Sequence, residues 1–436
     1  MIQYLKYLIL PIFLLLYIAG NGQTQNLSLQ DAVNYALSNH PDIKNKVLGE
    51  KYAKAQVDET TAYGIPQVSG NIQFMNNVKK QVFAFPDFVT GKNKPISIGT
   101  DYSTTVSINA TWLALDASYF LGLKASKAFV EITKHQTNQS KIDITANVIK
   151  SYYLVLITKE NIELIKQNVK TLEEILFQTE NYYKNGFAEK IDVDRLNLSL
   201  SNLKVQLENL TEQEKITEQL LKFNMGMPVE TSVFLTDNLE NIYSKSLIET
   251  EGKFDPKNRV EYKLLNAQLD LNKIDKKRYE MIYFPNLVFF STYQQNKLSD
   301  EFEFNNWIPN SFWGFKIGIP IFSGLANRAQ HSKRVITMEQ TLNNIKMFEN
   351  ASTFEANQAK TKYLRSVKTI EIQKKNLDLA NEILEIASKK LKEGVGSNLE
   401  ITNAQQEVKT SQTNYLNAIY DLLNAEIELK KAYGNL

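Results

Sequence analysis

The side chains that could carry out chemistry in this chain are scattered, and their spacing matches no catalytic motif. The three histidines, His40, His135 and His331, lie far apart in separate segments with helical patterns. No phosphate-binding glycine loop, HExxH stretch or GxSxG turn occurs. The neighbouring pairs 173–174 (Glu-Glu) and 389–390 (Lys-Lys) would point apart on a helix, which indicates solvent-exposed faces. We therefore expect no enzyme activity, no cofactor and no metal site.

The composition excludes further kinds of site. The 436 residues include 50 Lys and Arg against 48 Asp and Glu, and no cysteine. Nucleic-acid binding needs a concentrated basic excess, so we expect no nucleic-acid partner. Disulfides, thiolate metal sites and cysteine nucleophiles are excluded.

The first 22 residues have the pattern of a signal peptide. Lys6 is followed by an apolar run over 7–18 and by the small residues Gly20 and Gly22. An uncleaved membrane anchor is the alternative, but the apolar run is shorter than the roughly 20 residues that span a bilayer. We expect an exported protein whose signal peptide, 1–22, is removed.

A strand pattern occurs in STTVSINATW, residues 103–112, where apolar side chains such as Ile108 alternate with Ser, Thr and Asn. The segments 66–77 and 310–322 alternate similarly. Within the strand predicted over 285–296, the stretch LVFFSTY at 287–293 is ambiguous, with apolar residues on both faces. Transmembrane β-strands have this length, with apolar residues outward and polar residues inward. A soluble sheet with one wet face gives the same period. All three tryptophans, Trp112, Trp307 and Trp313, lie in or beside these strands, as in the aromatic belt of a membrane protein in contact with lipid.

Two very long helices are predicted beside these strands. No proline occurs in 97–227 or after Pro320, and the absence of helix breakers favours uninterrupted helices over 117–184 and 325–393. A helix of the first range would be roughly 100 Å long. Shorter helices are predicted over 188–226 and 398–433.

The sequence contains an internal duplication. NGFAEKIDVDRLN at 185–197 and EGVGSNLEITNAQ at 393–405 occupy equivalent places, and Gly186, Asp192 and Gly226 match Gly394, Glu400 and Gly434. Extra residues around VFAFPDFVTGKNKP in the first copy are predicted to form a longer loop. The first predicted repeat, 23–228, contains a helix over 28–63, a β-hairpin 66–114 and a helical hairpin 117–226. A connector, 229–257, follows it. The second predicted repeat, 258–436, contains a helix over 258–283, a β-hairpin 285–322 and a helical hairpin 325–433.

Apolar stripes predict that the helices pack side by side. Residues 193–210 carry a heptad stripe, and residues 377–391 carry two neighbouring stripes. Two stripes on one helix imply neighbours on two sides, although a long two-helix coiled coil is the simpler alternative. The stripes are Val193, Leu196, Leu200, Leu203, Leu207 and Leu210; Leu377, Ala380, Leu384, Ala387 and Leu391; and Leu379, Ile383 and Ile386.

Four strands cannot close a transmembrane barrel. Unpaired strand edges cannot face lipid, and the smallest such barrels have about eight strands. Several copies of the chain must therefore share one barrel. Two copies would give a barrel filled by side chains, and three would give one wide enough for a passage.

The chain resembles the TolC-like outer-membrane efflux proteins. The resemblance rests on LSLQDAVNYALSNHPDIK, YGIPQVSG, FKIGIPIFSGLANRAQ and GVGSNLEITNAQQ, in their order, spacing and duplication. It implies a mixed α and β membrane protein: a homotrimer with a shared twelve-stranded transmembrane β-barrel, four strands per chain, continued by a long α-helical barrel in the periplasm.

The resemblance also implies a function. The protein would be the passive exit duct of an efflux or type I secretion system in the outer membrane, with a periplasmic adaptor and an inner-membrane transporter as partners. The alternative is a periplasmic adaptor or a structural coiled-coil protein without a channel. Adaptors carry one helical hairpin between glycine-rich β-domains, whereas this chain has two hairpins and 17 glycines.

Site residues follow from the resemblance by position. The helix tips would contact the adaptor. Acidic residues near the tips would form a ring at a closed entrance. The resemblance implies a second carboxylate at the entrance, and Asn403 stands at that position in this chain. Glycine permits the chain reversal at each tip, and a ring of carboxylates would favour cations. Turn geometry and the helix dipole offer alternative reasons for the same residues. The expected tip residues are Gly186, Phe187, Gly394, Val395, Gly396 and Ser397, and the expected entrance residues are Asp192, Glu400 and Asn403.

Overall fold

The computed structural model describes residues 25–86, 91–245 and 254–436. They fall into two compact units, and each unit takes segments from both halves of the chain. The first comprises the described residues of 1–48, 134–264 and 345–436, and the second comprises those of 49–133 and 265–344. The predicted signal peptide, 1–22, lies outside the described residues.

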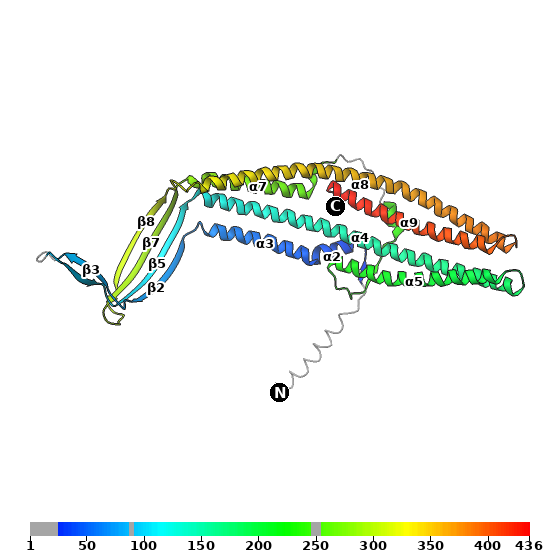
Figure 1. Ribbon diagram of the computed structural model, residues 1–436, viewed down its shortest axis with the longest axis horizontal. Helices are drawn as coiled ribbons and strands as arrows, with labels where there is room; N and C mark the ends of the chain where they lie inside the picture. Colours follow the sequence, from blue (N-terminus) through cyan, green and yellow to red (C-terminus); the bar gives the residue numbers. More distant parts are fainter. Residues whose placement is uncertain (1–24, 87–90, 246–253) are drawn as a thin grey trace, which may run out of the picture. The chain divides into compact units, whose positions relative to one another are not determined.

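Four long helices account for nearly half of the chain (Figure 1): α4 (Ala117–Lys184), α5 (Lys190–Met225), α8 (Ala326–Lys392) and α9 (Asn398–Tyr433). These bounds confirm the helices that the missing prolines predict. Helices α4 and α8 have 68 and 67 residues, and α5 and α9 have 36 each. The matched lengths agree with two copies of one plan. Within the ranges described, no helix is both long and apolar enough to cross a bilayer.

The helix predicted over 28–63 is wrong as a single element. It consists of α2 (Leu29–Asn39) and α3 (Pro41–Ala62), which are separated at His40. Proline disfavours helical backbone in the residue before it, and His40 accordingly has ψ 127°. In the second copy, the helix expected over 258–283 is α7 (Val260–Glu280), followed by the 3-10 turn η2 (Met281–Tyr283).

The predicted strands form one antiparallel sheet in the second unit. Its strands are β2 (Gln67–Asn76), β5 (Tyr102–Leu115), β7 (Asn286–Ser299) and β8 (Ile308–Gly318), in the order β2-β5-β7-β8. Strand β8 ends at Gly318, short of the expected 322, at its pair with Asn286, the first residue of β7.

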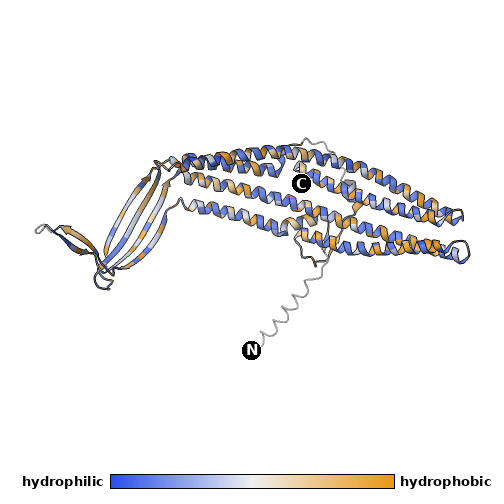
Figure 2. Cartoon of the chain, viewed as in Figure 1, coloured by the Kyte–Doolittle hydropathy of each residue, from blue (hydrophilic) through white to orange (hydrophobic). Residues whose placement is uncertain are grey.

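The register separates an apolar face from a polar face. Residues that pair directly lie on the same face of a sheet, so Ile108 shares its face with Tyr293, and Trp112 shares it with Phe289. Orange and blue alternate along these strands in Figure 2. The opposite face is polar, and there the Thr105 hydroxyl donates to Asn296 Oδ1 at 2.9 Å.

The same register resolves the ambiguous stretch 287–293. Phe289 and Tyr293 lie on the apolar face, while Val288 and Phe290 lie with the polar residues of β5. Apolar side chains on the apolar face are exposed in the single chain; Ile72, for example, is 80% exposed. A sheet face of this kind requires an apolar environment.

The extra segment of the first copy is not the loop that the sequence predicted. It contains a second antiparallel ribbon, β3 (Gln81–Pro86) and β4 (Asn93–Ile98), with Phe83 opposite Ile96. Its base is held by ion pairs, because Lys80 Nζ lies 2.7 Å from Asp300 Oδ1 and 3.3 Å from Asp101 Oδ1.

The connector joins the first unit through a small parallel pair, β1 (Gln25–Leu27) with β6 (Val233–Leu235), followed by α6 (Leu239–Lys245) and the 3-10 turn η1 (Pro256–Asn258). Buried Tyr152 supports this pair, since its hydroxyl lies 3.0 Å from Leu27 O and 2.8 Å from Asp237 Oδ2. Burial, with the Asp237 carboxylate, raises the pKa of Tyr152, so the hydroxyl stays protonated.

The heptad stripe of α5 packs in the core near the two helical turns. Leu196, Leu200 and Leu203 are buried there with Ile401 and Leu391. Helices α4, α5, α8 and α9 therefore pack around one apolar cluster, as the stripes predicted.

Removing one side chain from this cluster should loosen the tips. Leu196 is 0% exposed, and a buried Leu→Ala change costs about 2–5 kcal/mol because it leaves a cavity. We expect Leu196→Ala to increase amide hydrogen exchange across residues 190–203, measured by mass spectrometry on the detergent-solubilised protein. Glu208→Ala, an exposed position on the same helix, should leave exchange unchanged. Equal effects of the two substitutions would contradict this packing.

Candidate functional site at the helix tips

The turn between α4 and α5 closes α4 with a Schellman motif. Phe187 N–H donates to Tyr182 O at 2.8 Å, and Gly186 N–H donates to Tyr183 O at 3.0 Å. Gly186 has φ 80°, a left-handed conformation that side chains with a β-carbon resist. The chain therefore reverses here within a few residues.

The turn between α8 and α9 repeats the motif. Val395 N–H donates to Lys390 O at 3.0 Å, and Gly394, with φ 74°, donates to Leu391 O at 3.0 Å. Gly396 is required for a different reason, because a β-carbon there would lie 2.7 Å from Leu391 N. The expectation that glycines permit the reversals is confirmed in geometry; their part in docking remains a prediction.

The returning helices begin with caps that use the predicted acidic positions. Ser397 Oγ accepts the Glu400 N–H at 3.2 Å, and the Asp192 carboxylate accepts the Glu189 N–H at 3.4 Å. Both carboxylates stand in the first turn of a helix, where the dipole stabilises negative charge. Helix capping and the helix dipole therefore each give a structural role to Asp192 and Glu400.

Large apolar side chains stand exposed on both turns. Phe187 is 83% exposed and Val395 is 78% exposed. The two turns belong to the same unit, and near them Thr179 of α4 donates to Asn398 Oδ1 of α9 at 3.1 Å. The first unit thus presents two neighbouring turns, each with one apolar side chain in solvent.

Sequence reading missed the partner of Glu400. Lys390 Nζ lies 3.0 Å from Glu400 Oε1 across the second turn. The two residues are ten positions apart on antiparallel helices, so only the turn geometry reveals the pair. Asp192 has no such cationic partner within the described part of the chain. Nor do any three His, Asp or Glu side chains in those ranges come close enough to bind a metal ion together.

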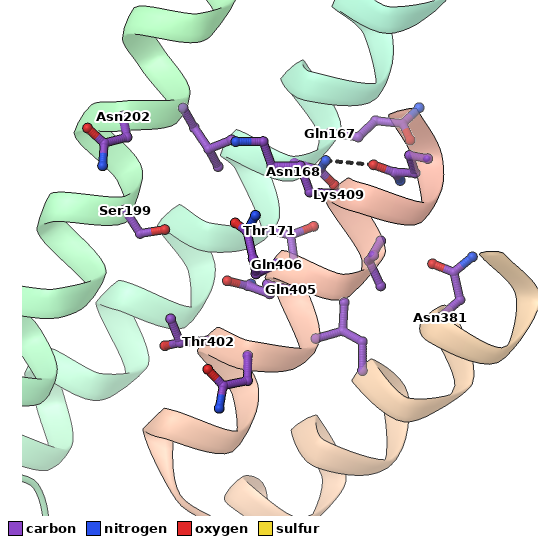
Figure 3. Close-up of a pocket in the computed structure, with 15 residues that line it drawn as sticks. Gln167, Asn168, Thr171, Ser199, Asn202, Asn381, Thr402, Gln405, Gln406 and Lys409 are labelled. Atoms are coloured by element: carbon purple, nitrogen blue, oxygen red, sulfur yellow. Dashed lines mark hydrogen bonds between the residues drawn. The ribbon is translucent and has the colours of Figure 1, made fainter. Parts of the chain in front are cut away.

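Asn403 lines a cavity of about 450 Å³ in the first unit. Side chains reach this cavity from α4, α5, α8 and α9, and most of them are amides and hydroxyls (Figure 3). Asn168 Nδ2 donates to Gln412 Oε1 at 2.8 Å on its border. Among the fifteen lining residues none carries a carboxylate, and Lys409 alone carries a charge.

Two of the three tryptophans lie at opposite ends of the sheet in the second unit, and the third lies in the middle of β8. Trp112 stacks on Phe289, with ring centroids 5.7 Å apart, and its Nε1 donates to Gly64 O at 3.0 Å. Trp313 lies on the same face of the sheet as Trp112, paired with Ser291 in the middle of β8. Trp307 precedes β8 at the other end and donates from Nε1 to Phe304 O at 2.9 Å. The positions of Trp112 and Trp307 suit aromatic belts at two boundaries, whereas Trp313 lies between them.

Two solved structures have a fold similar to that of this chain. VceC of Vibrio cholerae, an outer membrane protein, aligns over 93% of this chain and 96% of its own, with a TM-score of 0.74 and 13% identity. CusC, whose structures concern folding and transmembrane channel formation, aligns over 94% and 93%, with a TM-score of 0.77 and 17% identity. These likenesses show a shared fold.

Sequence comparison covers a similar extent. Nodulation protein T of Rhizobium leguminosarum bv. trifolii is 20% identical over 354 residues, which are 77% of this chain and 72% of that protein. The model of the outer membrane efflux protein family matches residues 32–227 and 280–435. Since that match covers most of the chain, the protein belongs to the outer membrane efflux protein family.

Proposed function

We propose that this outer-membrane efflux protein works as a homotrimer whose chains share one twelve-stranded barrel. The observation that supports this most directly is the open sheet. Among the residues that the structure describes, β2 and β8 each pair with one strand, and their free backbone groups would be unpaired in lipid. Three copies joined edge to edge would satisfy both edges and leave a passage.

The exposed stripe of α8 supports the same assembly. Leu379, Ile383 and Ile386 are exposed in the single chain, although the neighbouring stripe, with Ala387 and Leu391, is buried. A helix with a second apolar stripe requires a second neighbour. Helices of adjacent copies would supply it and would close an α-helical barrel in the periplasm.

The assembled protein would conduct its cargo passively. The sequence contains no nucleotide-binding loop, so an inner-membrane transporter would supply the energy for efflux or type I secretion. A periplasmic adaptor would dock on the tips, where Phe187 and Val395 offer exposed apolar side chains. Asp192, Glu400 and Asn403 would border the entrance. A periplasmic adaptor or coiled-coil protein without a channel is the alternative function, but it leaves the apolar sheet face without a partner.

The assembly predicts an oligomer with a pore. We expect the protein extracted from outer membranes in detergent to be a trimer by native mass spectrometry, and to give steady ion conductance in planar lipid bilayers. A single copy that inserts no channel would favour the alternative function.

The orientation of the strands predicts opposite effects for two neighbouring residues of β2. Ile72 lies on the apolar face and Asn71 on the polar face. An arginine facing lipid costs about 2–4 kcal/mol at the middle of the membrane, whereas one facing the lumen does not. We expect Ile72→Arg to reduce trimers in outer-membrane fractions and Asn71→Arg to preserve them, as judged by heat-modifiable gel mobility. The reverse result would place the polar face outward.

The tips predict a docking defect without a folding defect. Charged groups at Phe187 and Val395 would meet apolar adaptor side chains and stay without a partner. We expect the double substitution Phe187→Glu with Val395→Glu to weaken binding of the purified adaptor about tenfold or more, a loss of roughly 1.4 kcal/mol or more, in surface plasmon resonance. Thr211→Glu, an exposed position away from the turns, is the control. Unchanged binding by intact trimers would refute docking at these side chains.

A further inference from the structure

The cavity beside Asn403 differs in charge from an acidic entrance. Its lining contains Asn, Gln, Ser and Thr side chains from both helical hairpins, among them Asn202, Thr171 and Gln406 (Figure 3). Such groups donate and accept hydrogen bonds without carrying charge. The volume of about 450 Å³ lies in the range of small-molecule sites.

The nearby carboxylates do not contribute to this lining. Glu400 is paired with Lys390 at 3.0 Å, and Asp192 caps α5 through the Glu189 N–H at 3.4 Å. Neither residue borders the cavity. The negative charge of this region is therefore held at the turns.

Lys409 is the one charged group of the lining, and no carboxylate in the described part of the chain pairs with it. Its side chain is half-buried on α9. A cation without a counter-ion in a recess raises the local concentration of anions. The surrounding amide and hydroxyl donors can replace water around a carboxylate or phosphate oxygen.

We propose that this cavity is a section of the conduit that favours small anionic solutes, and that Lys409 determines this preference. The solutes are those that carry carboxylate, phosphate or sulfate groups together with neutral hydrogen-bonding groups. The inference rests on the proposed function, since it requires that the cavity faces the passage of a trimer. Its position supports this, because Thr402 and Asn403 follow the entrance residue Glu400 on the same helix and line the cavity.

The test measures ion selectivity of the full-length protein in planar bilayers. Reversal potentials in a KCl gradient give the permeability ratio of chloride to potassium, and a gluconate gradient tests an organic anion. We expect Lys409→Gln to lower the anion to cation ratio about twofold or more and Lys409→Glu to lower it further. Lys409→Arg should keep the ratio of the natural protein, because the charge is preserved.

A matched control removes one lysine from the other side of a lining helix. Lys215 on α5 is paired with Glu212 at 2.7 Å, and helical periodicity places it on the face opposite to Ser199 and Asn202. Lys215→Gln should leave selectivity unchanged. Conducting trimers in which Lys409→Gln has the selectivity of the natural protein would overturn the inference alone. Trimers that conduct no ions would overturn the proposed function, and the inference with it.

Discussion

Backbone N–H and C=O groups cannot remain unpaired in hydrocarbon, and the proposed assembly rests on this constraint. The sheet of one chain has two open edges, β2 and β8, and an apolar face that is exposed in isolation. Both deficits disappear if identical sheets join edge to edge and the apolar face meets lipid. The hydroxyl and amide side chains of the other face then line water, where they need no protein partner. The same event would bring the long helices of neighbouring copies together, which explains why α8 carries a second apolar stripe.

Duplication gives the two helical hairpins one geometry but different chemistry. Both turns end a helix of nearly equal length with a glycine in left-handed conformation, at Gly186 and Gly394. The following caps differ. Glu189 is the N-cap residue of α5, and its N–H donates to the Asp192 carboxylate. Ser397 is the N-cap residue of α9, and there the Glu400 carboxylate forms an ion pair with Lys390 instead. Equivalent acids in the two copies thus have different electrostatic surroundings, although the backbone that carries them is the same.

The parts of the fold that depend on short-range pattern could be predicted from the sequence. Missing prolines predicted α4 and α8 to within a residue, and the alternation of β5 predicted its faces. The break before Pro41 was missed although it has a local signal, since a proline disfavours helical backbone in the residue before it. The ribbon β3–β4 was missed because its strands are short and carry prolines, so that their pairing depends on the base that Lys80 holds.

The candidate site shows the limit of sequence reading more clearly. The turn positions could be predicted, because glycines and helix starts are local signals. The pairing of Lys390 with Glu400 could not, since it depends on how two antiparallel helices align across a turn. The cavity was invisible for the same reason, as its lining comes from four helices that only tertiary packing brings together.

Whether a charged side chain has an ion-pair partner determines how much it contributes to the electrostatic potential of the proposed passage. Counting acids at equivalent positions suggests a negative entrance, but a carboxylate with a lysine 3.0 Å away contributes little to the potential at longer range. A single unpaired lysine among neutral amides contributes more to this potential, because no nearby negative charge offsets it. The sign of the potential along a passage is therefore set by which charges lack partners. By that criterion Asp192 at the turn and Lys409 beyond it act in opposite directions.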